Sequence, residues 1–346
     1  MDLSAIISSF AVVVLHTSGN IININANSWK HPTAIVDILI QIVFVFGVPM
    51  FFMQSGANIL NYRKRYNTTT FFSKRIKKVV IPFIIWSIFI FILLCFQQNK
   101  LLNFFKLFLS GSIMGPYWFF YAIIGFYCCV PFLSIIIDNG TQKLCLYILA
   151  LTLIVNSILP LISQVLKVNN GFEFAFPAIG RYLQWFIIVG YYIVHYEVKH
   201  KKVIYSLGII SLVLEIALTF FATFATENNA YYIYVFGSIV TNFYDISRIF
   251  SFLAFSSLFL FLKNSERILS KCKYVKGISV LSKYTYGVYL IHPIFLMLCM
   301  KSMLRTLSFI PLIIQFVILP FLVYCLSVIL TILIKKSPYI GRILFP

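Results

Sequence analysis

The chain has 346 residues, of which 61% are apolar and only 11% are charged, and its formal net charge is +19. A water-soluble domain of this composition would expose large apolar patches, so lipid must be the solvent for most of its surface. The basic residues lie in short connections beside apolar runs, where they attract anionic headgroups and fix topology. Composition therefore predicts an integral membrane protein that contacts membrane lipids, and it excludes a nucleic-acid partner.

Apolar runs long enough to cross a hydrocarbon core, which takes about 20 helical residues, recur along the whole sequence. In chain order they cover residues 3–22, 34–57, 79–96, 116–137, 143–163, 179–195, 203–225, 244–262, 279–300 and 309–334. We therefore expect an all-α fold, a polytopic transmembrane bundle of about ten helices that forms a single domain over residues 1–346. The first run has neither a basic leader nor a small-residue cleavage site, so we interpret it as a retained helix.

Lys and Arg are concentrated in every second connection between these runs. Of the 28 basic residues, 20 lie there, within residues 63–78, 143, 199–202, 263–283 and 335–342. Cytoplasmic loops carry the Lys and Arg excess in membrane proteins. The sequence therefore predicts that these connections, including the loop over 63–78, and both termini lie in the cytoplasm.

Three ionisable residues lie deep inside predicted spans, where such groups are costly and usually face a polar cavity. His16 and His292 each lie about 13 residues, or roughly 20 Å, into a helix that runs outward. We therefore expect the two imidazoles at similar depth in the outer half of the membrane, although each could also be a packing residue. Glu215 is either a neutral acid bonded to a backbone carbonyl or a proton-relay group, and the sequence does not decide between them.

Helices that run inward begin at this same outer level and bring further polar and aromatic side chains to it. These are Asp37, Tyr117, Trp118, Arg181, Gln184, Trp185, Asp245 and Arg248. We expect them to line a polar chamber that opens outward. In the alternative interpretation, the tryptophans belong to interfacial belts, and the charged residues pair with each other or extend to the headgroups.

Five segments, spread over residues 2 to about 300, have the order and spacing of a known family. They are FAVVVLHT at 10–17, VPMFFMQSG at 48–56, FFSKRIKKVVIP at 71–82, PYWFFYAIIGFY at 116–127 and SKYTYGVYLIHP at 282–293. Together they resemble the integral-membrane acyltransferase family 3, bacterial proteins that O-acetylate surface glycans. The family's pattern pairs the first-helix His with a basic residue eleven positions earlier, and that position here is Ala5. A nearby cation such as Lys74, Arg75 or Lys78 would have to substitute for it.

The resemblance implies an enzyme, an acetyl-CoA-dependent O-acetyltransferase in the bacterial inner membrane. Its acceptor would be a hydroxyl group of a surface polysaccharide or of the lipid-linked precursor. His16 would act as a general base, because an unperturbed imidazole titrates near neutral pH, or it would carry the acetyl group itself. Arg75, Lys74 and Lys78 would bind the phosphates of CoA through charge-assisted hydrogen bonds.

Other residues have supporting roles in this hypothesis. We expect His292 and Arg181 as further catalytic residues, and Arg181, Tyr117 or Ser55 could polarise the carbonyl or the developing oxyanion. Trp118 or Trp185 could stack on the sugar ring. The seven cysteines form no C-x-x-C pair, so no metal site is predicted.

Two other functions stay open at this point. The family also contains members assigned to the export of surface polysaccharide, so an exporter or flippase is one alternative. A non-catalytic partner of a polysaccharide synthase is the other. The acceptor glycan, the acyl group and the oligomeric state, including a homo-oligomer, are not determined by the sequence.

Overall fold

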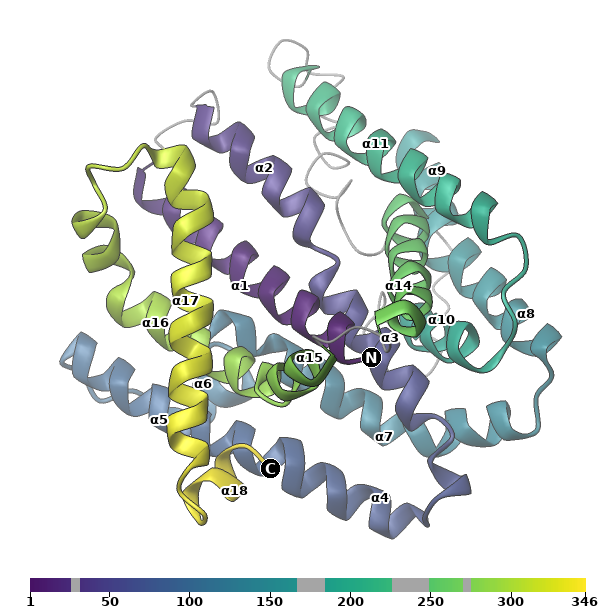
Figure 1. Cartoon of the computed structure of the whole chain (residues 1–346), viewed down its shortest axis with the longest axis horizontal. Helices are drawn as coiled ribbons and strands as arrows, with labels where there is room; N and C mark the ends of the chain where they lie inside the picture. The colour runs from purple at the N-terminus through teal and green to yellow at the C-terminus, as the bar shows by residue number, and fades with distance from the viewer. Residues whose placement is uncertain (26–31, 167–183, 226–248, 270–274) are drawn as a thin grey trace. The chain divides into compact units, whose positions relative to one another are not determined.

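The computed structural model describes residues 1–25, 32–166, 184–225, 249–269 and 275–346 (Figure 1). These residues are almost entirely helical and include no strand. The stretches long and apolar enough to cross a membrane are Asp2–Ile21, Ile35–Lys64, Thr68–Gln98, Gly115–Asp138, Lys201–Phe220, Thr285–Thr306 and Leu312–Lys335. The predicted all-α, multi-pass membrane fold is therefore confirmed, whereas ten spans and cytoplasmic termini stay predictions.

The chain divides into two compact units that each draw on several stretches of sequence. Unit 1 comprises residues 1–8, 41–64 and 129–276, and unit 2 comprises residues 9–40, 65–128 and 277–346. Four of the described helices contribute residues to both units: α1 (Asp2–Asn25), α2 (Pro32–Phe44), α7 (Trp118–Asp138) and α15 (Val275–Ser282). The expectation of a single domain over 1–346 stays a prediction.

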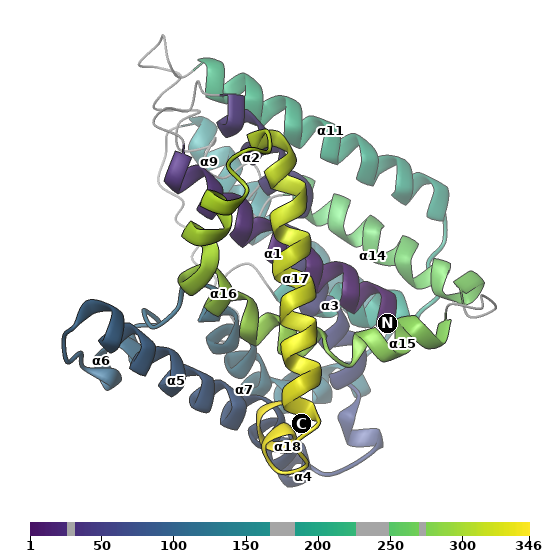
Figure 2. The same ribbon diagram turned by 60° about the vertical axis from the view of Figure 1, so that its left-hand side comes forward.

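Unit 1 is built around two close helix pairs. Its other helices are α3 (Gly47–Ile59), η1 (Tyr62–Lys64), α8 (Gln142–Leu153), η4 (Ile154–Ile158), α9 (Leu159–Leu166), α10 (Gln184–His195), α11 (Lys201–Ala225) and α14 (Ile249–Leu269). Helices α11 and α14 lie side by side (Figures 1 and 2), and α3 packs on α10. A Cβ atom on Gly56 would collide with the Ile187 carbonyl, and one on Gly190 would collide with the Met53 carbonyl. Small residues thus let the backbones of α3 and α10 approach, as is common between membrane helices.

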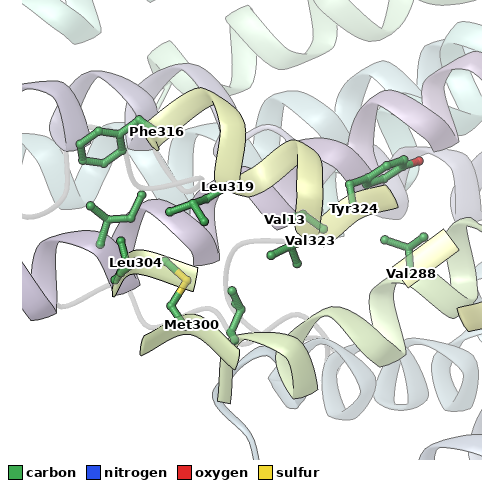
Figure 3. Packing of buried hydrophobic residues seen from close by; sticks show 10 residues of the cluster. Val13, Val288, Met300, Leu304, Phe316, Leu319, Val323 and Tyr324 are labelled. Carbon is green, nitrogen blue, oxygen red and sulfur yellow. The ribbon is translucent and has the colours of Figure 1, made fainter. Parts of the chain in front are cut away.

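Unit 2 has a core between α1, α16 and α17. Its remaining helices are α4 (Thr68–Arg75), η2 (Ile76–Val80), α5 (Ile81–Gln98), α6 (Phe104–Leu109), η3 (Gly115–Tyr117), α15 (Val275–Ser282), α16 (Thr285–Thr306), α17 (Leu312–Lys335) and α18 (Ile340–Leu344), with α15 beginning at the unit boundary. Val13, Val288, Leu319 and Val323 are fully buried in this core (Figure 3). Their close packing holds helices α1 and α16 in place relative to each other.

The basic segment over residues 63–78 is mostly helical, so the expectation of a loop was wrong. The Asn67 side chain accepts a hydrogen bond from the Thr70 backbone N–H at 2.9 Å and caps α4. The polar run over 67–70 is thus a cap followed by the first helical turn. The π-helix η2 begins directly after Arg75, and α5 continues from it. Arg75 therefore lies on a rigid helix, next to a π-helical turn of the kind that is frequent at functional sites.

Candidate functional site

The structure brings together the two histidines that the sequence placed at one depth. His16 on α1 and His292 on α16 both belong to unit 2, with ring centroids 5.5 Å apart and ring planes stacked at 22°. His292 is fully buried, and His16 is half-buried. Two imidazoles in face-to-face contact inside a membrane bundle form a compact polar site with four ring nitrogens.

The orientation of the His292 ring follows from its own helix. Pro293 supplies no N–H to the Tyr289 carbonyl four residues before it. His292 Nδ1 lies 3.0 Å from the Val288 carbonyl oxygen and also comes close to the Tyr289 carbonyl. Because a carbonyl can only accept, Nδ1 carries the proton and Nε2 keeps its lone pair. Nε2 is buried and has no hydrogen-bond partner within the described ranges, so it can accept a bond from a ligand.

Two tyrosines fasten α16 to the residues that precede α7. The Tyr289 hydroxyl donates to the Pro116 carbonyl at 2.7 Å, and the Tyr117 hydroxyl donates to the Leu290 carbonyl at 2.9 Å. The Tyr289 ring also meets the His292 ring edge to face, with centroids 5.7 Å apart. Tyr117, expected to contact substrate, therefore already uses its hydroxyl to hold α16 and its imidazole in place.

Arg75 is placed differently from the lysines around it. Its guanidinium carbon lies 5.5 Å from the ring centroids of both Phe71 and Tyr127. Its Nε atom is buried without a hydrogen-bond partner in the part of the chain that the structure describes. Lys74 and Lys78 are exposed. A guanidinium against two aromatic rings can make a bidentate contact with an anion, whereas the ammonium of Lys74, which lies 4.0 Å from the Tyr66 ring centroid, acts as a point charge.

The other predicted ligands do not join this group. Trp118 is 41% exposed at the start of α7, which suits an interfacial belt residue. Ser55 is half-buried on α3 in unit 1. The expectations for Arg181, Asp245 and Arg248, and for the side chains of Gln184 and Trp185, lie outside the described residues. The outward-facing chamber as a whole therefore stays a prediction.

Glu215 has a partner that the sequence did not indicate. Its carboxyl group is fully buried in unit 1, where the Ser251 hydroxyl on α14 donates to Oε1 at 2.8 Å. This bond joins α11 to α14, so Glu215 contributes to helix association. Nowhere in the described ranges do three or more His, Cys, Asp or Glu side chains gather as ligands of a metal would.

Tyr286 carries a buried polar group that sequence reasoning did not single out. It lies on α16, three residues before Tyr289 and six before His292, and its ring contacts Phe120 with centroids 6.3 Å apart. Its hydroxyl is buried without a hydrogen-bond partner among the residues that the structure describes. The spacing of three along one helix was the only signal in the sequence, because it places the side chain on the same row as the histidine.

The fold and the site define a multi-pass membrane protein with a polar centre inside its helices. A family model described as an acyltransferase domain matches residues 1–335. The chain therefore belongs to acyltransferase family 3, as its segments suggested, and it is a membrane acyltransferase. Comparisons with curated proteins and with solved structures gave no match.

Proposed function

We propose that this acyltransferase moves an acetyl group from cytoplasmic acetyl-CoA to a hydroxyl group of a bacterial surface polysaccharide or its lipid-linked precursor. The inner membrane is the compartment where both substrates meet. The stacked pair of His16 and His292 is the observation that carries the proposal. Polar groups at membrane depth are costly, and they mark reaction centres and substrate paths in membrane proteins.

The chemistry requires one proton acceptor. Neutral His16 takes the proton of the acceptor hydroxyl while the hydroxyl oxygen attacks the carbonyl carbon of the thioester. The carbon–sulfur bond breaks, and the CoA thiolate leaves and takes the proton back from the imidazolium. The products are the acetyl ester and CoA. His292 Nε2, whose lone pair is preserved by the bond from Nδ1 to the Val288 carbonyl, accepts a hydrogen bond from a neighbouring hydroxyl of the acceptor sugar and so orients the sugar.

In an alternative sequence of steps, His16 carries the acetyl group. Its ring nitrogen attacks the carbonyl carbon of the thioester, the carbon–sulfur bond breaks and the CoA thiolate leaves. The acceptor oxygen then attacks the acetylimidazolium, neutral imidazole leaves, and the hydroxyl proton passes to the CoA thiolate. Arg181 and Ser55 stay candidates for binding the developing oxyanion, and Trp118 and Trp185 for stacking on the sugar. Rapid acid quenching after mixing with labelled acetyl-CoA separates the two routes, because only the second places label on the protein.

Arg75 is the proposed dock for the phosphates of CoA, with Lys74 and Lys78 adding positive potential nearby. The contact of its guanidinium with two aromatic rings supports this assignment. Arg75 could also replace the basic residue that the family's pattern has at the position of Ala5. A preorganised arginine elsewhere in the same unit as the histidines can supply the missing positive charge.

The test compares two histidine variants in inverted membrane vesicles that contain lipid-linked glycans, with acetyl-labelled acetyl-CoA as donor. His16→Ala should lower the transfer rate by about 10²- to 10⁴-fold, as expected for loss of a general base, and leave the protein folded. His195→Ala is the control, since that ring bonds the Ala57 carbonyl in unit 1, and it should keep its specific activity. If His16→Ala lost thermal stability but kept its specific activity, His16 would be a packing residue and the proposal would fail.

A further inference from the structure

Unit 2 contains several buried polar atoms for which the described protein residues provide no hydrogen-bond partner. Among them are Arg75 Nε, the Tyr286 hydroxyl and His292 Nε2. A polar group left unsatisfied at membrane depth is costly, so such atoms indicate where a polar ligand binds. Arg75 and His292 already belong to the proposed donor dock and transfer centre. Tyr286 belongs to neither.

Tyr286 differs from the other tyrosine on its face of α16. The rings of Tyr286 and Tyr289 both contact Phe120 on α7, with centroid distances of 6.3 and 5.5 Å. The Tyr289 hydroxyl donates to the Pro116 carbonyl and so contributes to packing. The Tyr286 ring is packed against the same residue, but its hydroxyl is not used to join helices. Packing therefore explains the ring of Tyr286 and not its hydroxyl group.

The position of Tyr286 is intermediate between the two proposed sites. On one side it is within electrostatic range of Tyr127, whose ring holds the Arg75 guanidinium. On the other side the row continues through Tyr289 to His292, six residues along α16, which corresponds to a rise of about 9 Å. A ligand that follows this row from an anionic group at Arg75 to a reacting carbonyl at the histidines would reach Tyr286.

We infer that the Tyr286 hydroxyl donates a hydrogen bond to an amide carbonyl of the pantetheine arm of the acyl donor. The inference rests on the proposed function, in which acetyl-CoA is that donor. Pantetheine carries two amide groups between its phosphate and its sulfur, separated by short alkyl stretches. Aromatic faces at Phe120 and Tyr289 suit the alkyl stretches, and the hydroxyl suits an amide. Tyr286 is thus a binding residue for the arm that delivers the thioester to the histidine pair.

Calorimetric titration of the purified full-length protein tests this inference with three probes: CoA, pantetheine and 3′,5′-ADP. Tyr286→Phe should lower the affinity for CoA and for pantetheine roughly 3- to 10-fold, which corresponds to the loss of one neutral hydrogen bond. The affinity for 3′,5′-ADP should be unchanged. Arg75→Ala should lower the affinity for CoA and for 3′,5′-ADP but not the affinity for pantetheine. The matched control is Tyr192→Phe, whose hydroxyl accepts a bond from Gln142 in unit 1, and it should bind all three probes like the wild type.

The outcomes separate the inference from the function on which it rests. The unfolding temperature of Tyr286→Phe should equal that of the wild type, because the removed hydroxyl makes no bond to the described protein. Equal CoA affinity in Tyr286→Phe and wild type would overturn the inference and leave the Arg75 dock intact. An equal loss of affinity for pantetheine and for 3′,5′-ADP in Tyr286→Phe would also overturn the inference, since it would indicate a general distortion of the protein. A wild-type protein that binds neither CoA nor pantetheine would overturn the proposed donor itself.

Discussion

Two helix contacts in the described part of the chain involve a histidine, and they use its ring nitrogens in opposite ways. Where α3 meets α10 in unit 1, His195 Nε2 bonds the Ala57 carbonyl at 2.9 Å, and Gly56 and Gly190 bring the backbones together. On α16 in unit 2, His292 bonds its own helix through Nδ1 and leaves Nε2 buried without a partner among the described residues. The first contact uses its ring nitrogen for packing, and the second leaves one available to a ligand. Hydrogen-bond satisfaction, more than burial, therefore distinguishes the packing histidine from the histidine that we propose for the reaction.

The largest effect that tests the difference between His195 and His292 is expected on the transfer rate when His292 is replaced. His292→Phe keeps an aromatic ring against His16 but removes both ring nitrogens, so the transfer rate should fall by about 100-fold, the lower range for loss of a positioned acid–base group. The equivalent change at the packing histidine, His195→Phe, should leave the turnover number unchanged. Turnover of the two purified variants in vesicles, with thermal unfolding recorded in parallel, provides the comparison. Turnover of His292→Phe within twofold of wild type would place His292 with the packing residues.

The next largest effect concerns the α3–α10 crossing. Gly56→Ala should lower the free energy of unfolding by about 1–3 kcal/mol, because the new methyl group collides with the Ile187 carbonyl and forces the helices apart. Gly125→Ala on α7 is the control, since a Cβ there meets nothing within 4 Å, and it should be neutral or slightly stabilising. Unfolding in mixed detergent micelles would measure both. Equal stability of the two variants would argue against a tight crossing of α3 and α10.

A smaller effect is expected on the donor side, where Arg75 and Lys74 are neighbours on one helix. Arg75→Ala should raise the KM for acetyl-CoA about tenfold, because a seated guanidinium makes charge-assisted hydrogen bonds to phosphate. Lys74→Ala should change it less than about twofold, since an exposed ion pair contributes little. The salt dependence of KM should weaken more in the first variant than in the second. Equal effects would mean that the segment acts only as a diffuse positive field.

That the chain forms apolar spans, and that His16 and His292 lie at one level along them, could be predicted from the sequence for one physical reason. A membrane helix satisfies its backbone hydrogen bonds internally, so apolar length alone indicates where it lies, and 1.5 Å per residue then gives depth. Counting along α1 and α16 therefore placed His16 and His292 at one level, and the structure stacks them. The helix that carries Lys74 and Arg75 was missed, because Asn67 and the threonines after it suit both a turn and a helix cap.

Which tyrosine hydroxyls find a hydrogen-bond partner could not be predicted from the sequence. Tyr117, Tyr286 and Tyr289 all lie in apolar segments rich in aromatic residues, yet two donate to carbonyls of distant segments and one has no partner in the described protein. Which hydroxyl reaches a carbonyl depends on how α16 packs on the start of α7, a tertiary relationship between residues 173 positions apart. The same reasoning applies to Glu215, whose partner Ser251 is on another helix.

The central claim is that His16 and His292 act as one catalytic unit, and a double-mutant cycle on the transfer rate tests it most directly. Rates are measured for wild type, His16→Ala, His292→Phe and the double variant, all purified and shown to be folded. Residues that act together are non-additive, so the double variant should be no slower than His16→Ala alone. A double variant slowed by the product of the two single effects would contradict the account, because the histidines would then act independently.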